Sequence, residues 1–125
     1  MKGEPFLKEN LSNEAKSVIK ALSGKHAENL VALNLGDTTT LADTFVLATA
    51  NSDVHMNTLM ETATETIEGL NLPVRVEGAG SARWRLIDAG NLVIHIFSKQ
   101  GRDFYGLERI WGDAETFTFE DDSEL

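Results

Sequence analysis

The chain has 125 residues and carries 20 acidic against 11 basic side chains, a formal net charge of −9. This length suits a single domain, and 42% hydrophobic with 25% charged residues is an ordinary globular composition. The deficit of Lys and Arg argues against a protein that binds nucleic acid directly. The absence of Cys from the sequence excludes a disulfide framework, thiol catalysis and a Cys-based zinc site.

No targeting or membrane signal stands out. The first residues, Met-Lys-Gly-Glu-Pro, contain no apolar stretch, and no apolar run approaches the ~18 residues of a membrane span. We therefore expect a cytoplasmic protein without a membrane partner.

The negative charge is concentrated at the end of the sequence, since residues 113–125 hold six acids and no base, which leaves a net charge of −3 on residues 1–112. We expect residues 114–125 to form a solvated acidic tail behind a domain at 1–113.

The first part of the chain predicts a helix followed by two strands. Apolar side chains recur at helical spacing over residues 11–22. Residues 29–35 (Asn-Leu-Val-Ala-Leu-Asn-Leu) then predict a strand, and the polar residues 36–40 predict a loop. Residues 44–50 (Thr-Phe-Val-Leu-Ala-Thr-Ala) are apolar on both faces, which is typical of a buried central strand.

A second helix begins after Asn51-Ser52-Asp53, because all three residue types are good helix caps. Its apolar residues follow one another at spacings of three and four from Met56 to Leu70, and Pro73 ends it. A short strand at 74–77 follows. This order predicts a crossover helix that joins two parallel strands.

The last third of the chain predicts a hairpin and a final helix. Residues 83–88 and 91–97 flank Ala89-Gly90, a hairpin signal. Over residues 102–111, the apolar Phe104, Leu107 and Trp111 recur at helical spacing, so we assign them to the core. Gly106 weakens this helix by about 1 kcal/mol relative to Ala. The whole pattern predicts an α/β fold with a single mixed sheet flanked by helices.

Catalytic motifs are weak in this sequence. Ser52, Asp53 and His55 lie close together, but they stand where a helix needs side-chain acceptors for its free N–H groups, so capping is favoured over a nucleophilic site. A less favoured interpretation is that the helix start near Ser52 binds an anion. No Asp-x-Asp or Asp-x-Glu pair alternates along a strand, as nucleotidyl transfer with paired metal ions would need. We expect no enzyme.

The three histidines, His26, His55 and His95, fall on different predicted elements. This spacing does not match a metal site, and we expect neither a metal nor a cofactor. His95 lies within an apolar strand and is assigned to the core.

Aromatic and arginine residues gather in two segments, 83–85 and 102–111. These contain both tryptophans, the only tyrosine and most of the arginines. Trp, Tyr and Arg dominate the hot spots of protein interfaces. Trp84 and Tyr105 alternate with charged neighbours, which suits a surface position as well as a place in the core. The two segments therefore favour a protein-binding surface.

The sequence resembles the ribosomal silencing factors, also called Iojap-like proteins. The matching blocks occur in family order from about residue 11 to 113. They are Leu41–Val46, Ala48–Ser52, Val76–Gly78, Ser81–Trp84, Val93–Phe97 and Arg102–Asp113. The resemblance implies a nucleotidyltransferase-like fold without the catalytic carboxylates.

The resemblance also implies a function. Family members bind the large ribosomal subunit through its basic protein fourteen and sterically prevent the small subunit from joining, which damps translation when nutrients are scarce. It implies little direct contact with nucleic acid, and it is compatible with a homodimer. By motif position, the implied contact residues are Trp84, Tyr105, Leu107 and Glu108, with Arg102 and Asp43 as secondary ones. The alternatives are a nucleotidyltransferase-like nucleotide-binding enzyme and a dimeric adaptor.

Overall fold

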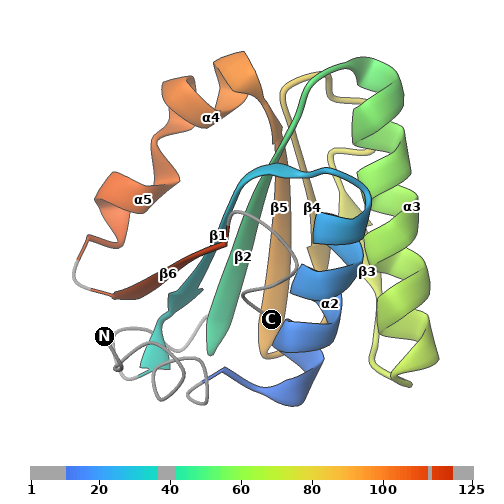
Figure 1. Cartoon of the computed structure of the whole chain (residues 1–125), viewed down its shortest axis with the longest axis vertical. Helices are drawn as coiled ribbons and strands as arrows, with labels where there is room; N and C mark the ends of the chain where they lie inside the picture. Colours follow the sequence, from blue (N-terminus) through green and yellow to red (C-terminus); the bar gives the residue numbers. More distant parts are fainter. Residues whose placement is uncertain (1–10, 37–41, 113, 120–125) are drawn as a thin grey trace.

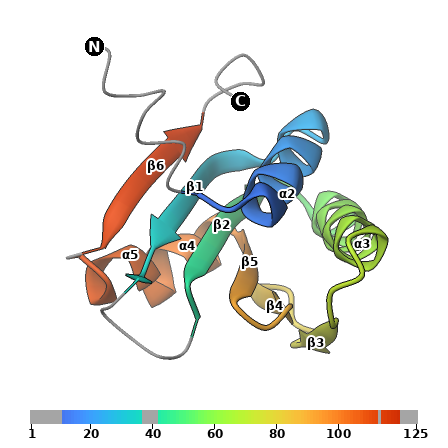
Figure 2. The ribbon, with the colours of Figure 1, turned by 90° about the horizontal axis from the view of Figure 1, so that it is seen from below.

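The computed structural model describes residues 11–36, 42–112 and 114–119, which form a six-stranded sheet with helices on both faces (Figures 1 and 2). The strand order is β3-β4-β5-β2-β1-β6. The strands are β1 Glu28–Asn34, β2 Thr44–Ala50, β3 Arg75–Glu77, β4 Trp84–Asp88, β5 Leu92–Ser98 and β6 Glu115–Phe119. Helices α2 (Asn13–Gly24) and α3 (Asp53–Gly69) cover one face, and α4 (Lys99–Tyr105) and α5 (Leu107–Ile110) lie on the other. The predicted α/β fold is confirmed.

The sheet is mixed because β2 and β5 pair in parallel while its other described pairings are antiparallel. The predicted hairpin between β4 and β5 is confirmed. The predicted crossover through α3 is confirmed, since β2 and β3 run in the same direction, but the two strands are not neighbours because β4 and β5 lie between them. The physical reason is burial, since β5 is buried along most of its length and takes the central place, whereas β3 is exposed and takes the edge.

Both long helices begin at a side-chain cap, and the cap of the second helix is the predicted one. Ser12 Oγ accepts a hydrogen bond from the backbone N–H of Ala15 at 3.1 Å, and Ser52 Oγ accepts one from that of His55 at 3.0 Å. The His55 ring adds a second cap, because its Nδ1 accepts the backbone N–H of Asn51 at 2.9 Å. The capping interpretation of this segment is therefore confirmed. Within the described residues, neither these helices nor the shorter ones have the length and apolarity needed to cross a membrane.

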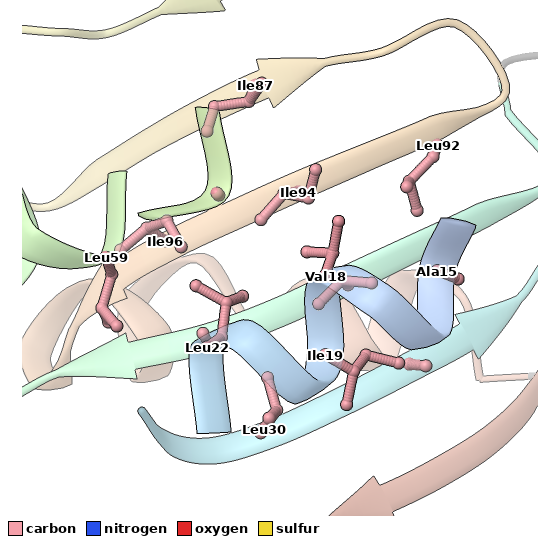
Figure 3. Close-up of a cluster of buried hydrophobic side chains, with 14 of the residues drawn as sticks. Ala15, Val18, Ile19, Leu22, Leu30, Leu59, Ile87, Leu92, Ile94 and Ile96 are labelled. Carbon is pink, nitrogen blue, oxygen red and sulfur yellow. The ribbon is translucent and has the colours of Figure 1, made fainter. Parts of the chain in front are cut away.

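The face of the sheet under α2 and α3 is closed by aliphatic side chains (Figure 3). Val18, Ile19 and Leu22 from α2 pack with Leu59 from α3 above the strands. The strand residues labelled beneath them are Leu30, Ile87, Leu92, Ile94 and Ile96. Each side chain of this kind stabilises the fold by about 1.5–3 kcal/mol when it leaves water. We call this layer the α2–α3 face.

The prediction of a solvated acidic tail is wrong for residues 115–119. They form β6, which pairs antiparallel with β1, and Phe117 and Phe119 are buried against the α2–α3 core. The reason is that the two phenylalanines stand two positions apart, so both rings reach the same face of the sheet. The expectation for residues 120–125 lies outside the described residues.

Candidate functional site

The helix predicted over residues 102–111 is interrupted at Gly106. Gly106 has a φ of +53°, in the left-handed region that favours glycine, and it ends α4 and precedes α5. The interruption removes the helical register between Phe104 and Leu107. Leu107 is buried as expected, but Phe104 is 71% exposed, so its assignment to the core is wrong. Trp111 is half-buried, with its ring centroid 5.9 Å from that of Phe45.

Trp84 lies at the centre of the aromatic side chains on the α4 side of the sheet. It stands opposite Phe97 in the β4–β5 ladder, and the two rings stack with centroids 5.5 Å apart. The Tyr105 ring, at the end of α4, lies 4.6 Å from the Trp84 ring. The indole Nε1–H of Trp84 donates a hydrogen bond to Nδ1 of His95 at 3.1 Å. The fold thus joins the two aromatic segments that the sequence singled out.

This cluster continues to the surface. The Phe104 ring packs edge-on against Tyr105, with centroids 5.0 Å apart. Tyr105 is 37% exposed and Trp84 is half-buried. We call Trp84, Phe104 and Tyr105 the aromatic patch. Ile110, on α5, is also exposed. Contiguous exposed rings of this kind mark interaction sites, because a folded protein gains nothing by leaving them in water.

Arg102 forms the polar anchor beside the patch. Its Nε and Nη2 atoms donate to the two carboxylate oxygens of Glu108 at 3.0 Å each, and its Nη1 donates to Thr49 Oγ1 at 2.8 Å. The Arg102 side chain is only 8% exposed. It therefore connects β2 to α5 inside the protein, and the bidentate geometry sets the orientation of the Glu108 carboxylate.

The Glu108 carboxylate is held in its charged form. The hydrogen bonds from Arg102 lower the pKa of Glu108 below its usual value, and they outweigh burial, which raises it. The charges of Arg102 and Arg109 lower this pKa further. The Glu108 side chain is 41% exposed. Glu108 therefore presents an ionised carboxylate to solvent at neutral pH, and the Arg102 guanidinium balances its charge.

His95 is a core residue, as predicted, but only one of its ring nitrogens is paired. Its ring is 4% exposed, and the centroid lies 4.5 Å from that of Phe45. Burial lowers the pKa of His95 to about 4, so the ring is neutral at physiological pH. Nδ1 accepts from Trp84, whereas Nε2 is buried without a hydrogen-bond partner among the described residues.

The structure brings together five of the six expected contact residues. Trp84, Tyr105, Arg102, Leu107 and Glu108 lie on the α4 side of the sheet, with Leu107 packed in the core there. Asp43 stands apart. Asp43 precedes the first residue of β2. Trp84 lies beside the other end of β2, because Trp84 pairs with Phe97 on β5 and Phe97 in turn pairs with Thr49 on β2. Six residues of strand separate the two positions by roughly 20 Å.

Two exposed apolar residues on α4 and α5, Phe104 and Ile110, were not predicted as contacts. The sequence contained a signal for Phe104, because Gly106 can end a helix in the left-handed conformation and free the residue two positions earlier from the helical pattern. The anchoring role of Thr49 had no comparable signal. Nothing in the spacing of residues 49 and 102 indicates that they meet.

The possible anion site near Ser52 finds little support in the local geometry. The Ser52 hydroxyl caps α3, and Asp53 adds a negative charge to the first turn. Across the described part of the chain, no three His, Asp or Glu side chains are grouped closely enough to hold a metal ion.

Comparisons with known proteins point to one family. A family model described as "Ribosomal silencing factor during starvation" matches residues 8–125. "Ribosomal silencing factor RsfS" from Halalkalibacterium halodurans is 36% identical over 103 residues, which are 82% of this chain and 88% of that protein. A more distant relative from Mus musculus, "Mitochondrial assembly of ribosomal large subunit protein 1", is 22% identical over 75% of this chain and 43% of its own length.

Two solved structures share the fold of this chain. A crystal structure from Chromobacterium violaceum superposes with a TM-score of 0.76 at 27% identity, covering 79% of this chain and 83% of that one. Another, from Bacillus halodurans, has a TM-score of 0.70 at 31% identity and covers 85% of this chain and 95% of that one.

Proposed function

This chain belongs to the ribosomal silencing factor family of ribosome-associated translation regulators, and on that premise we propose that it silences by occlusion. It binds the large ribosomal subunit through the subunit's basic protein fourteen, and its bound body occupies space that the small subunit needs. The name of the mouse relative, an assembly factor of the large subunit, supports the choice of subunit. No chemical step is required, which suits a regulator rather than an enzyme.

The observation that carries this proposal is the aromatic patch beside a fixed carboxylate. Exposed Phe104 and Tyr105 and half-buried Trp84 supply the residue types that anchor protein interfaces. Standard interfaces bury about 1,600 Å² in total, and a few well-packed anchors provide most of their affinity. The patch gives such anchors to a partner that covers α4 and α5.

Charge supports a basic partner. Glu108 is ionised and held by Arg102 within the same surface. A carboxylate that is already oriented loses little side-chain entropy on binding. Complementary charge chiefly raises the association rate and sets the register of the complex. Because Arg102 balances the charge of Glu108, the preference for a basic protein over the phosphate backbone of RNA rests on the net charge of −3 over residues 1–112.

The expected contact residues take different roles in this proposal. Trp84, Tyr105 and Glu108 touch the partner, while the buried Arg102 and Leu107 position them. Asp43 is exposed at the other end of β2 and serves as a separate, secondary contact. An offset of roughly 20 Å lies within the span of a standard interface.

Co-sedimentation with purified large subunits tests the proposal. We expect Tyr105→Ala to weaken binding at least about tenfold, as truncation of an interface hot spot does, and Trp84→Ala to act in the same direction. Val54→Ala is the matched control, because Val54 is 74% exposed on α3, which covers the opposite face. Thermal unfolding of each variant checks that the domain remains folded.

The outcomes separate the alternatives. Unchanged binding by both aromatic variants would remove the proposed surface. A shift from dimer to monomer with Tyr105→Ala, without any effect on subunit binding, would instead assign the patch to self-association. Adding the protein before the small subunit should lower the yield of joined ribosomes, and an unchanged yield despite binding would contradict occlusion.

A further inference from the structure

We propose that His95 is a positioning residue, whose Nδ1 atom holds the Trp84 indole in the orientation that the aromatic patch presents to a partner. Because Trp84 is a contact residue only under the proposed function, the consequence for binding rests on that function. The effect on the orientation of Trp84 does not.

The register of the sheet places the two side chains together. Trp84 pairs with Phe97 across the β4–β5 ladder, and His95 stands two positions before Phe97 on the same face. His95 is thus the diagonal cross-strand neighbour of Trp84, within reach of a long aromatic side chain. The distance between Trp84 Nε1 and His95 Nδ1 is 3.1 Å, a hydrogen bond of ordinary length.

This bond determines the state of the imidazole. Nδ1 can accept the indole proton only through its lone pair, so the ring is neutral and its own proton is on Nε2. Nε2 is buried and has no hydrogen-bond partner among the described residues. The low pKa of His95, about 4, keeps this arrangement in place at physiological pH.

The unpaired Nε2 indicates why a histidine is present at this position. A buried donor without a partner destabilises the fold, and the neighbouring rings, Phe45 and Phe97, make an aromatic site that a phenylalanine would fill at no such cost. The benefit that offsets the cost is the Nδ1 acceptor, which receives the proton of the Trp84 indole nitrogen.

The bond acts on the site because Trp84 is the inner member of the patch. Its ring stacks on Phe97 and contacts Tyr105. Stacking alone permits the indole to slide or rotate within its plane, since ring contacts are only weakly directional. The bond to Nδ1 selects one orientation, and Tyr105 packs against the ring in that orientation. A partner then meets a preformed surface and loses less entropy on binding.

Three substitutions in the full chain test this role. In His95→Asn, an amide oxygen replaces the acceptor near the position of Nδ1. His95→Gln is the matched polar control, because its amide group reaches the position of Nε2 instead. In His95→Phe, the ring shape remains but the acceptor is lost. Thermal unfolding of all three identifies any variant that does not fold. His95→Asn compared with either of the others tests the acceptor, and if His95→Asn does not fold, His95→Phe compared with the wild type still tests it.

The first measurement is the indole N–H signal of Trp84 in a ¹H–¹⁵N spectrum, with Trp111 as the internal reference and Trp84→Phe for assignment. We expect His95→Phe and His95→Gln to shift this signal and to speed its exchange with solvent, while His95→Asn stays near the wild type. An unchanged Trp84 signal in His95→Phe, or the same change in His95→Asn as in His95→Phe, would overturn the proposal.

The second measurement is binding to purified large subunits. We expect His95→Phe and His95→Gln to bind roughly five- to tenfold more weakly, as the loss of one hydrogen bond implies, and His95→Asn to recover most of the affinity. Shifted indole signals with unchanged binding, while Tyr105→Ala still weakens binding, would overturn the link between Trp84 orientation and the partner. If neither Tyr105→Ala nor Trp84→Ala affects binding, the proposed function fails, and the indole signal alone then decides the positioning role.

Discussion

The two faces of this sheet are built in different ways. The α2–α3 face is covered by helices of 12 and 17 residues and packed with aliphatic side chains. The opposite face is covered by helices of 7 and 4 residues, and it holds the buried His95 and Arg102 together with most of the ring contacts. One face is closed, and the other remains partly open around the aromatic patch.

Stability comes mainly from the α2–α3 face, and binding from the opposite face. Long amphipathic helices bury a continuous apolar stripe, and this burial is the main favourable term in folding. Short helices cannot cover the sheet, so rings such as Phe104 remain in water. Exposed rings add little to folding but are available to a partner. We therefore expect substitutions on the two faces to affect different properties.

The largest expected effect on stability is on the closed face. Ile94 lies in the centre of β5, fully buried against α2 and α3. Ile94→Ala should lower the free energy of unfolding by about 2–5 kcal/mol, because it removes buried methyl groups and leaves a cavity. Urea unfolding measures this change, and the folded fraction should bind large subunits like the wild type. A loss below about 1 kcal/mol would contradict the role assigned to this face.

The next effect is acid sensitivity of the open face. The pKa of His95 is about 4 in the folded state, against 6.5 for a histidine side chain in water, so below pH 6.5 the unfolded chain takes up a proton that the folded one does not. Stability is therefore complete above pH 6.5 and falls as the pH drops towards 4, by about 3 kcal/mol in total.

Urea unfolding at pH 7, 5.5 and 4 checks this prediction against His95→Asn, which has no imidazole to titrate. Glu108 also loses stabilisation, as the pH falls through its lowered folded pKa, but it does so equally in both proteins. The difference between them thus reports His95. Identical pH profiles would show that the ring is not buried as a neutral group.

The smallest effect on stability is expected at the aromatic patch. Phe104→Ala should change the free energy of unfolding by less than about 0.5 kcal/mol, since the ring is mostly in water. Val54→Ala, at a similarly exposed position on α3, should be equally neutral. The two should differ in large-subunit binding, which only Phe104→Ala should weaken. Equal binding by both would contradict the division between the faces.

Much of the fold could be predicted from local patterns. Ser52 caps the second long helix where the sequence indicates, and Ala89-Gly90 connects a hairpin. Two features escape these patterns. β6 is short and embedded in acidic residues, so charge obscures the alternation of Phe117 and Phe119. Helix propensity marks Gly106 only as a weak point in one helix, although its left-handed backbone divides two.

The amino-acid sequence alone is enough to predict the α/β class, the order of most elements, the family, and the two aromatic segments that make the candidate site. These depend on spacing along the chain, which helix and strand geometry convert into faces. The three-dimensional structure was needed to show that Arg102 is an internal anchor, that Phe104 is exposed, and that Trp84 donates a hydrogen bond to His95. Burial and hydrogen bonding depend on which distant strands become neighbours, and the local spacing of apolar residues along the chain does not contain that information.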